Sequence, residues 1–186
     1  MSIRIIGGEL KGRKLVTVVG KETRPTSDRV RESIFNILGN CVQDACVLDL
    51  YAGTGAMGIE ALSRGAKWAF FAEGQRAALA ALAKNIKKCS LENRTNTIQC
   101  NILDDLKILQ SYRPAFDLVF IDPPYNKDMI QPTLSHLARS QCLVKDARLA
   151  IEHSPRESIP ENRPEFEMTG QRRYGKTLVS FFIYML

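Results

Sequence analysis

The residues best suited to chemistry are Asp122, Pro123, Pro124 and Tyr125, which follow the apolar run 116–121. Two consecutive prolines fix the backbone φ and remove two amide donors, so this loop presents acceptors: the Asp122 carboxylate and the Pro123 carbonyl. A rigid acceptor pair suits an –NH2 group, which has two hydrogens to donate. The ring of Tyr125 can stack on a planar base. The motif therefore indicates a site that holds the amino group of a nucleobase.

Such a loop would serve a reaction at nitrogen. The amino nitrogen of a base is a poor nucleophile because its lone pair is delocalised into the ring. Two acceptors can draw this nitrogen towards tetrahedral geometry and align it with an electrophilic methyl group, so that the gain is largely positioning and electrostatics. Asp122 would stabilise the positive charge that develops on nitrogen. The alternative is an ordinary turn at a strand end, where Asp and Pro are common.

A second motif is a glycine loop that follows residues 46–50. Gly53, Gly55 and Gly58 satisfy G-x-G-x-x-G, and Glu73 lies 20 residues after Gly53, which is formally the dinucleotide fingerprint. Asp49 separates the cofactors, because a carboxylate beside the loop would repel the pyrophosphate of NAD. It would favour the sulfonium and ammonium groups of S-adenosylmethionine. We therefore expect S-adenosylmethionine, with Glu73 accepting hydrogen bonds from the ribose hydroxyls.

Both motifs follow strands in a repeating β-α pattern. Apolar runs predict strands at residues 46–50, 68–72, 97–100, 116–121 and 149–152, with helices at 56–64, 76–88, 103–109 and 129–138. The last two strands, 166–168 and 177–184, can pair as a hairpin. The pattern predicts a mostly parallel sheet with helices on both faces and one antiparallel strand. Ligands bind at the carboxyl edge of such a sheet, where both motifs lie.

The first 24 residues predict a small β arm, ahead of a domain spanning residues 25–186. The arm's short strands are separated by glycine turns, and its small apolar area means that it lies against a larger body or projects from it. A helix follows, capped by Thr26 or Ser27 and closed by Gly39. Its apolar stripe is expected to consist of Val30, Ile34, Ile37 and Leu38.

Positive charge is concentrated at the N-terminus. Residues 1–31 hold eight cations and three anions, a net charge of +5 out of +6 for the whole chain. Such a concentration attracts a phosphate backbone, although a solvated surface that aids solubility would look the same.

Length and composition exclude several classes of protein. A chain of 186 residues fits one domain with a well-buried core. No apolar run approaches the roughly 20 residues that span a bilayer, and the N-terminus has no signal-peptide pattern, so a cytoplasmic protein is expected. Five cysteines without C-x-x-C spacing argue against zinc and disulfides. No metal is expected, and nothing in the sequence calls for more than a monomer.

The two motifs resemble the cofactor loop and catalytic loop of class I amino-methyltransferases, and further segments resemble the RsmD family. These segments are 4–8, 11–13, 23–26, 28–36, 58–66 and 174–177. The resemblance implies a Rossmann-like, seven-stranded sheet with a basic N-terminal arm. It also implies transfer of a methyl group from S-adenosylmethionine to N2 of a guanine in 16S ribosomal RNA, either naked or in a small-subunit assembly intermediate.

The resemblance also implies roles for particular residues. The catalytic residues would be Asp122, Pro123, Pro124 and Tyr125. The cofactor site would be lined by Asp49, Ala52, Gly53, Thr54, Gly55, Glu73, Asn101 and Ile102. RNA phosphates would be met by Arg4, Lys11, Arg13, Arg24, Arg29 and Arg31. Asn101 departs from the pattern, because related enzymes often have an acidic residue there to accept from the adenine amino group.

Three other functions stay open from the residues. A DNA adenine or cytosine amino-methyltransferase would use the same catalytic loop, but such enzymes usually need an added recognition domain. An NAD-dependent oxidoreductase leaves Asp49 misplaced and residues 122–125 without a use. A non-catalytic RNA-binding module would be expected to have lost one of the main site residues.

Overall fold

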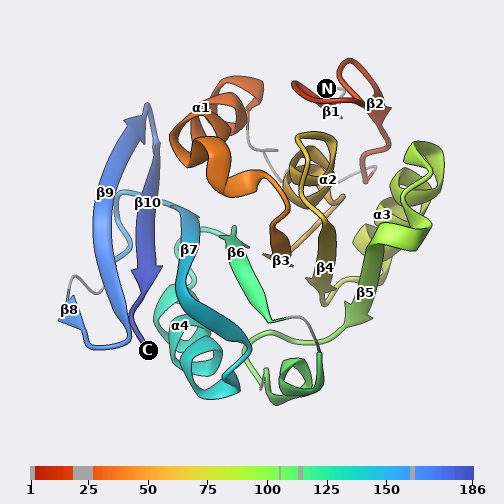
Figure 1. The fold of residues 1–186 in the computed structure, drawn as a ribbon. Coiled ribbons are helices and arrows are strands. Elements are labelled where there is room, and N and C mark those ends of the chain that lie inside the picture. Colours follow the sequence, from red (N-terminus) through yellow and green to blue (C-terminus); the bar gives the residue numbers. More distant parts are fainter. Residues whose placement is uncertain (1–2, 19–26, 105, 113–114, 160–161) are drawn as a thin grey trace.

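The structure is a computed structural model that describes residues 3–18, 27–104, 106–112, 115–159 and 162–186. One eight-stranded sheet has the order β5-β4-β3-β6-β7-β10-β9-β8 (Figure 1). The strands are β3 Cys46–Leu50, β4 Trp68–Glu73, β5 Thr95–Gln99, β6 Phe116–Ile121, β7 Leu143–His153, β8 Asn162–Arg163, β9 Phe166–Tyr174 and β10 Thr177–Tyr184.

Strands β3 to β7 run parallel, and β10 enters antiparallel between β7 and β9. The predicted mostly parallel sheet with an antiparallel strand is confirmed. The two-residue strand β8 extends it beyond the seven strands expected, by pairing antiparallel with β9.

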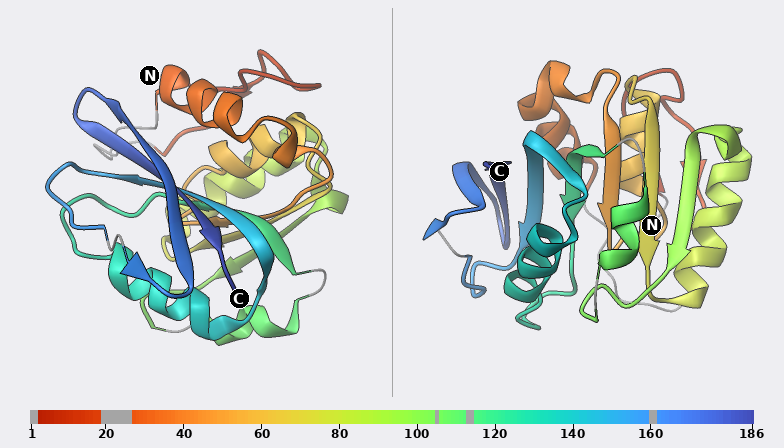
Figure 2. Two further views of the ribbon diagram at one scale, coloured as in Figure 1. Left: turned by 60° about the vertical axis from the view of Figure 1, so that its left-hand side comes forward. Right: turned by 60° about the horizontal axis from the view of Figure 1, so that its bottom comes forward.

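Helices cover both faces of the sheet, which Figure 2 shows from two sides. One face carries α1 Asp28–Leu38, α2 Ala56–Ser63 and α3 Arg76–Cys89; the other carries α4 Ile130–Ser140. Alternate strand residues feed two separate cores: Val47 and Phe120 pack under α1 to α3, whereas Leu48 and Ile121 pack under α4. Burial on both faces explains why these strands read as continuous apolar runs.

Helix α1 begins and ends where the sequence predicts. The Ser27 hydroxyl accepts from the Val30 amide at 3.3 Å, and Gly39 ends the helix with φ 52°. Val30, Ile34 and Leu38 are buried as expected, but the prediction for Ile37 is wrong, because its side chain is 44% exposed. Arg31 and Phe35 complete the buried face of the helix instead, so that residues 31, 34, 35 and 38 lie at helical spacing.

Three other predicted elements need correction. Strand β9 extends to Tyr174 rather than ending at Met168. No α-helix is present over the described part of 103–109; a turn there is followed by a 3-10 helix, η3 Lys107–Ser111. Strand β7 begins at Leu143 rather than Leu149. Buried and exposed residues do not alternate in its first half, since Val144, Lys145 and Asp146 are all exposed. Its register with β6 also shifts at this point.

The N-terminal arm is docked against the body of the protein. Its strands β1 Ile3–Arg4 and β2 Lys14–Leu15 pair antiparallel. Glu60 of α2 is fully buried and accepts from the amides of Ile6 and Gly7, both at 2.8 Å. The Ser63 hydroxyl accepts from the Leu10 amide at 2.9 Å. Four apolar residues of the arm, Ile3, Ile5, Leu10 and Leu15, belong to the core under α1 to α3. The expected boundary at residues 24–25 lies outside the described residues.

Candidate active site

The two predicted loops leave neighbouring strands at the same level. Leu50 of β3 pairs with Ile121 of β6, so the glycine loop and the 122–125 loop start side by side. After β3 the chain builds β4 and β5 on one side, and β6 and β7 lie on the other. This reversal of strand order is the point at which open α/β sheets bind ligands.

Two carboxylates hold the glycine loop by accepting its backbone amides. Asp49 Oδ2 accepts from the Gly58 amide at 2.9 Å. Glu73, at the end of β4, accepts from the Gly53 amide at 2.8 Å and from the Gln75 amide at 2.7 Å. Because β3 and β4 are paired, the two carboxylates lie on adjacent strands and flank the loop.

The glycines of the loop are required for different reasons. Gly53 and Gly55 have φ angles of 57° and 81°, which favour glycine. A Cβ at Gly55 would also overlap Leu82 Cδ1, whereas a Cβ at Gly53 would have only the Tyr51 carbonyl within 4 Å, at 3.9 Å. Gly58 lies against the Phe71 ring and Asp49. Gly55 and Gly58 therefore let the loop pack closely, and Gly53 provides the backbone conformation.

Asp49 is a buried carboxyl group beside the glycine loop. It is 3% exposed, and burial raises its pKa to about 8; Glu73 adds to this rise, and the Gly58 amide opposes it. A positively charged ligand beside Asp49 would favour the ionised form and lower this pKa. The sulfonium and ammonium groups of S-adenosylmethionine would lower the pKa in this way, whereas an anionic pyrophosphate would raise it further.

The remaining predicted cofactor residues differ in their burial and in their hydrogen bonds. Ala52 is buried, and its amide donates to the Ala72 carbonyl at 3.2 Å. The Thr54 carbonyl accepts from Asn85 Nδ2 at 2.9 Å. Asn101 is exposed and donates to Asp104 at 2.8 Å, so its amide closes a turn after β5. The Ile102 side chain is 2% exposed and packs in the core under α4.

The 122–125 loop is anchored from neighbouring strands. Asp122 is half-buried, Pro123 is buried and Pro124 is exposed. The Tyr125 hydroxyl donates to Glu152 Oε1 at 2.6 Å and lies 3.1 Å from Thr177 Oγ1. Burial and then the Glu152 carboxylate raise the pKa of Tyr125, so its hydroxyl stays protonated as a donor. Glu152 was not among the predicted site residues, although an acid at the end of the predicted apolar strand 149–152 was a usable signal.

The predicted RNA-binding residues do not all reach the surface. Lys11, Arg13 and Arg29 are exposed, and Arg4 is exposed beside Asp28, at 3.1 Å. Arg24 lies outside the described residues.

The prediction for Arg31 is wrong, because its side chain is 1% exposed. It donates to Asp28 at 3.0 Å and to the Arg4 carbonyl, and its Nε lies 3.7 Å from Glu60 Oε2. Burial lowers the pKa of Arg31, against the raising effect of Glu60. Arg31 therefore compensates the buried Glu60 that holds the arm.

Two groups of arm contacts were also missed. Lys88 of α3 donates to the Lys14 carbonyl at 2.7 Å, and Arg13 donates to the Lys88 carbonyl at 2.9 Å. We call the exposed cations Lys11, Arg13, Lys14, Lys87 and Lys88 the arm–α3 basic face. Asn85 is fully buried, pairs with the Val16 backbone at 2.6 and 3.0 Å and donates to Thr54. It joins the arm to the glycine loop.

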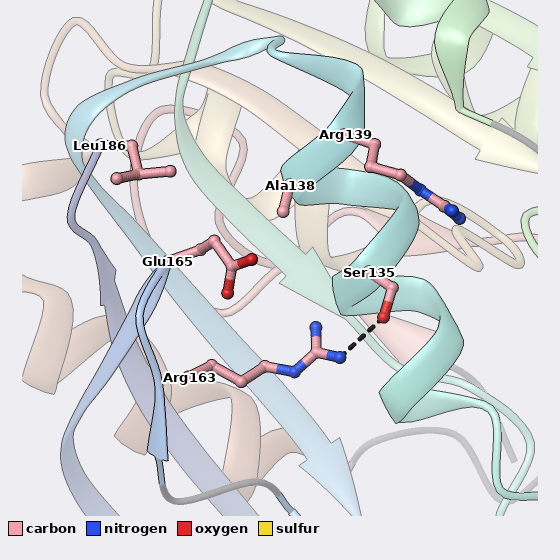
Figure 3. A pocket seen from close by; sticks show the side chains of 6 residues that line it. All are labelled: Ser135, Ala138, Arg139, Arg163, Glu165 and Leu186. Atoms are coloured by element: carbon pink, nitrogen blue, oxygen red, sulfur yellow. Dashed lines mark hydrogen bonds between the residues drawn. The ribbon is translucent and has the colours of Figure 1, made fainter.

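A hollow of about 290 Å³ lies elsewhere, between α4 and the C-terminal end of the chain (Figure 3). Arg163 crosses it and donates to Ser135 at 2.7 Å. None of the predicted site residues lines it. In the part of the chain that the structure describes, no cluster of His, Cys, Asp or Glu could hold a metal ion. None of the described helices is long and apolar enough to cross a membrane.

The sheet order, with an antiparallel strand inserted beside β7, is that of the class I S-adenosylmethionine-dependent methyltransferases. The family model described as "Conserved hypothetical protein 95" matches residues 3–183. The chain belongs to this family, the RsmD family.

Known proteins resemble the chain over most of its length. Ribosomal RNA small subunit methyltransferase D of Haemophilus influenzae is 38% identical over 164 residues, covering 86% of this chain and 84% of the relative. YlbH of Bacillus subtilis is 34% identical over 180 residues, covering 97% and 98%. The solved structure of yhhF from Escherichia coli superposes with a TM-score of 0.85 at 31% identity, covering 100% of this chain and 99% of that one.

Proposed function

We propose that the protein transfers a methyl group from S-adenosylmethionine to the exocyclic N2 of a guanine in 16S ribosomal RNA. The observation that carries the proposal is the pairing of Leu50 with Ile121, which brings the glycine loop, flanked by Asp49 and Glu73, beside the 122–125 loop. The Haemophilus relative, named a small-subunit ribosomal RNA methyltransferase, supports the substrate class. A ribosomal RNA substrate would place the reaction in the cytoplasm.

Each part of the site has a task in this reaction. S-adenosylmethionine supplies a methyl group already activated by its sulfonium. Asp49 would face the cationic part of the cofactor, and Glu73 would accept from its ribose. Asp122 and the Pro123 carbonyl would accept the two hydrogens of the guanine amino group and align its nitrogen with the methyl group. The target base must leave its stack to reach this loop, as in other base-modifying enzymes, and would rest on Tyr125.

The experiment is methyl transfer from labelled S-adenosylmethionine to small-subunit RNA, and to subunits that lack the modification, with nucleoside analysis of the product. N2-methylguanosine at one position is the expected product. Transfer to DNA but not RNA would favour the amino-methyltransferase on DNA adenine or cytosine instead.

The arm–α3 basic face is proposed to bind the RNA backbone, together with Arg4, Arg24 and Arg29. Replacing Lys11 and Lys87 by Glu should weaken RNA binding and lower the slope of log affinity against log salt by about 0.7–0.9 per lost phosphate contact. Lys145→Glu makes the same change of charge at the exposed start of β7 and serves as control. Equal salt slopes in the wild type, the double variant and the control would contradict an RNA-binding role for this face.

A further inference from the structure

We propose that Glu152 is a positioning residue for the methyl-accepting base: it holds the Tyr125 hydroxyl and thereby fixes the ring on which the base stacks. This inference rests on the proposed function, because it assigns the exposed ring a planar partner. It adds a residue from another strand, 27 positions away, to the loop that binds the amino group.

The contact joins an exposed ring to a buried anchor. Tyr125 is 36% exposed, whereas Glu152 is 8% exposed. The short 2.6 Å bond and the nearby Thr177 hydroxyl hold only the far end of the tyrosine. The near end is fixed by the prolines before it, whose φ angles are restricted. The ring is thus held at both ends while part of its surface stays open to solvent.

Packing alone does not explain a glutamate at this point of β7. Ala150 and Ile151, which precede it, are buried and apolar, and burying a carboxylate is unfavourable unless hydrogen bonds compensate it. The hydrogen bond from Tyr125 is such a compensation, and it is charge-assisted and directional. A carboxylate at position 152 is therefore less favourable to bury than an apolar side chain, but it fixes the position of the Tyr125 hydroxyl.

The position matters because the acceptors lie in the same loop. Ile121 pairs with Ile151, so Asp122, the first residue after β6, lies beside Glu152, the next residue of β7. A base that stacks on Tyr125 must present its amino group to Asp122 and the Pro123 carbonyl. Errors of about 1 Å in such alignment can cost about a hundredfold in rate. A loosened ring should therefore slow transfer and leave the cofactor loop, on the other side of β6, unchanged.

The test is a double-mutant cycle with Tyr125→Phe, Glu152→Ala and their combination, using kcat and KM for RNA and the Kd for S-adenosylmethionine. Each single variant should lower kcat/KM about ten- to a hundredfold, the usual effect of losing a hydrogen bond to a charged group, mainly through kcat. The double variant should be no worse than the more affected single variant. Glu152→Gln keeps an acceptor oxygen and should restore most of the activity. The Kd of the cofactor should stay the same throughout.

Additive losses in the cycle, no loss in Glu152→Ala, or a parallel loss of cofactor binding would overturn the inference. Failure of this inference can be distinguished from failure of the proposed function. N6-methyladenosine as the wild-type product would overturn the guanine assignment, and the same cycle would still decide the role of Glu152. If the wild type methylates no polynucleotide, the same double-mutant cycle is measured by fluorescence. The signal is the quenching of 2-aminopurine, placed as an unpaired base in an RNA hairpin, when the protein binds. Quenching that is equal in all four proteins would overturn the inference.

Discussion

The cofactor side and the base side of the site are built differently. On the cofactor side, Asp49 and Glu73 accept backbone amides from the glycine loop that they flank. On the base side, Tyr125 is held by side chains of β7 and β10. The first arrangement depends on nearby residues of one β-α-β unit. The second requires strands that meet only when the sheet is complete.

This difference explains what the sequence could predict. The Asp49–Gly58 bond spans nine residues and the Glu73–Gly53 bond spans 20, and both follow from a motif whose spacing fixes the geometry. Strands and helices near this motif were predicted within a few residues. Glu152 lies 27 residues and Thr177 52 residues from Tyr125, and no local pattern links them.

The wrong prediction for Arg31 has the same cause. A helical arginine in a basic segment is expected to be exposed, because charged side chains are seldom buried unless they are paired. Its partner Glu60 lies in another helix, and the need to hold the arm became visible only in the packed structure. The roles predicted for the exposed arm cations remain predictions.

The largest effect that would separate the two sides is expected from Asp122→Ala. Loss of this acceptor should lower kcat by roughly a hundred- to a thousandfold, as for other groups that stabilise transition-state charge, while cofactor affinity is kept. Single-turnover transfer and calorimetry with S-adenosylmethionine measure the two quantities. Asp128→Asn removes an exposed carboxylate close by and should leave both unchanged. Equal loss of transfer and cofactor binding in Asp122→Ala would mean that the two sides are one structural unit.

Asp49→Asn should affect the other side, with a smaller effect. Removing its charge should weaken S-adenosylmethionine binding about ten- to a hundredfold, the range for losing a charged hydrogen-bonding partner, and leave transfer at saturating cofactor largely intact. Glu73→Gln should weaken binding less, because ribose hydroxyls are neutral. A stronger effect of Glu73→Gln than of Asp49→Asn would contradict the charge-based account.

Cofactor binding should also depend on pH through Asp49. Its pKa is about 8 in the free protein, and a bound cation lowers it, so binding releases a proton. Affinity should therefore rise with pH by at most about tenfold per unit as the pH approaches 8. Calorimetry at pH 6, 7 and 8 checks this; Asp49→Asn should lose the dependence, as should 5′-methylthioadenosine, which lacks the ammonium. Affinity that falls over this range would show that Asp49 does not meet the cation.

Asp49→Asn is also expected to make the folded protein more stable. The folded-state pKa of Asp49 lies above its ordinary value of 3.8, so the folded protein binds this proton more tightly than the unfolded chain. The resulting stability is present below pH 3.8 and is lost as pH rises through about 8. Asp49→Asn should therefore raise the free energy of unfolding more at pH 8 than at pH 5, as measured by urea denaturation. If Asp49→Asn is less stable than the wild type at pH 8, the ionised Asp49 does not destabilise the folded protein. That result would contradict our account of Asp49.

The most direct measurement is nucleoside analysis of small-subunit RNA after incubation with methyl-labelled S-adenosylmethionine and either the wild type or Asp122→Ala. Our account predicts label in N2-methylguanosine with the wild type, and almost none with the variant although it still binds the cofactor. Label in another nucleoside, or equal label with both proteins, would contradict it.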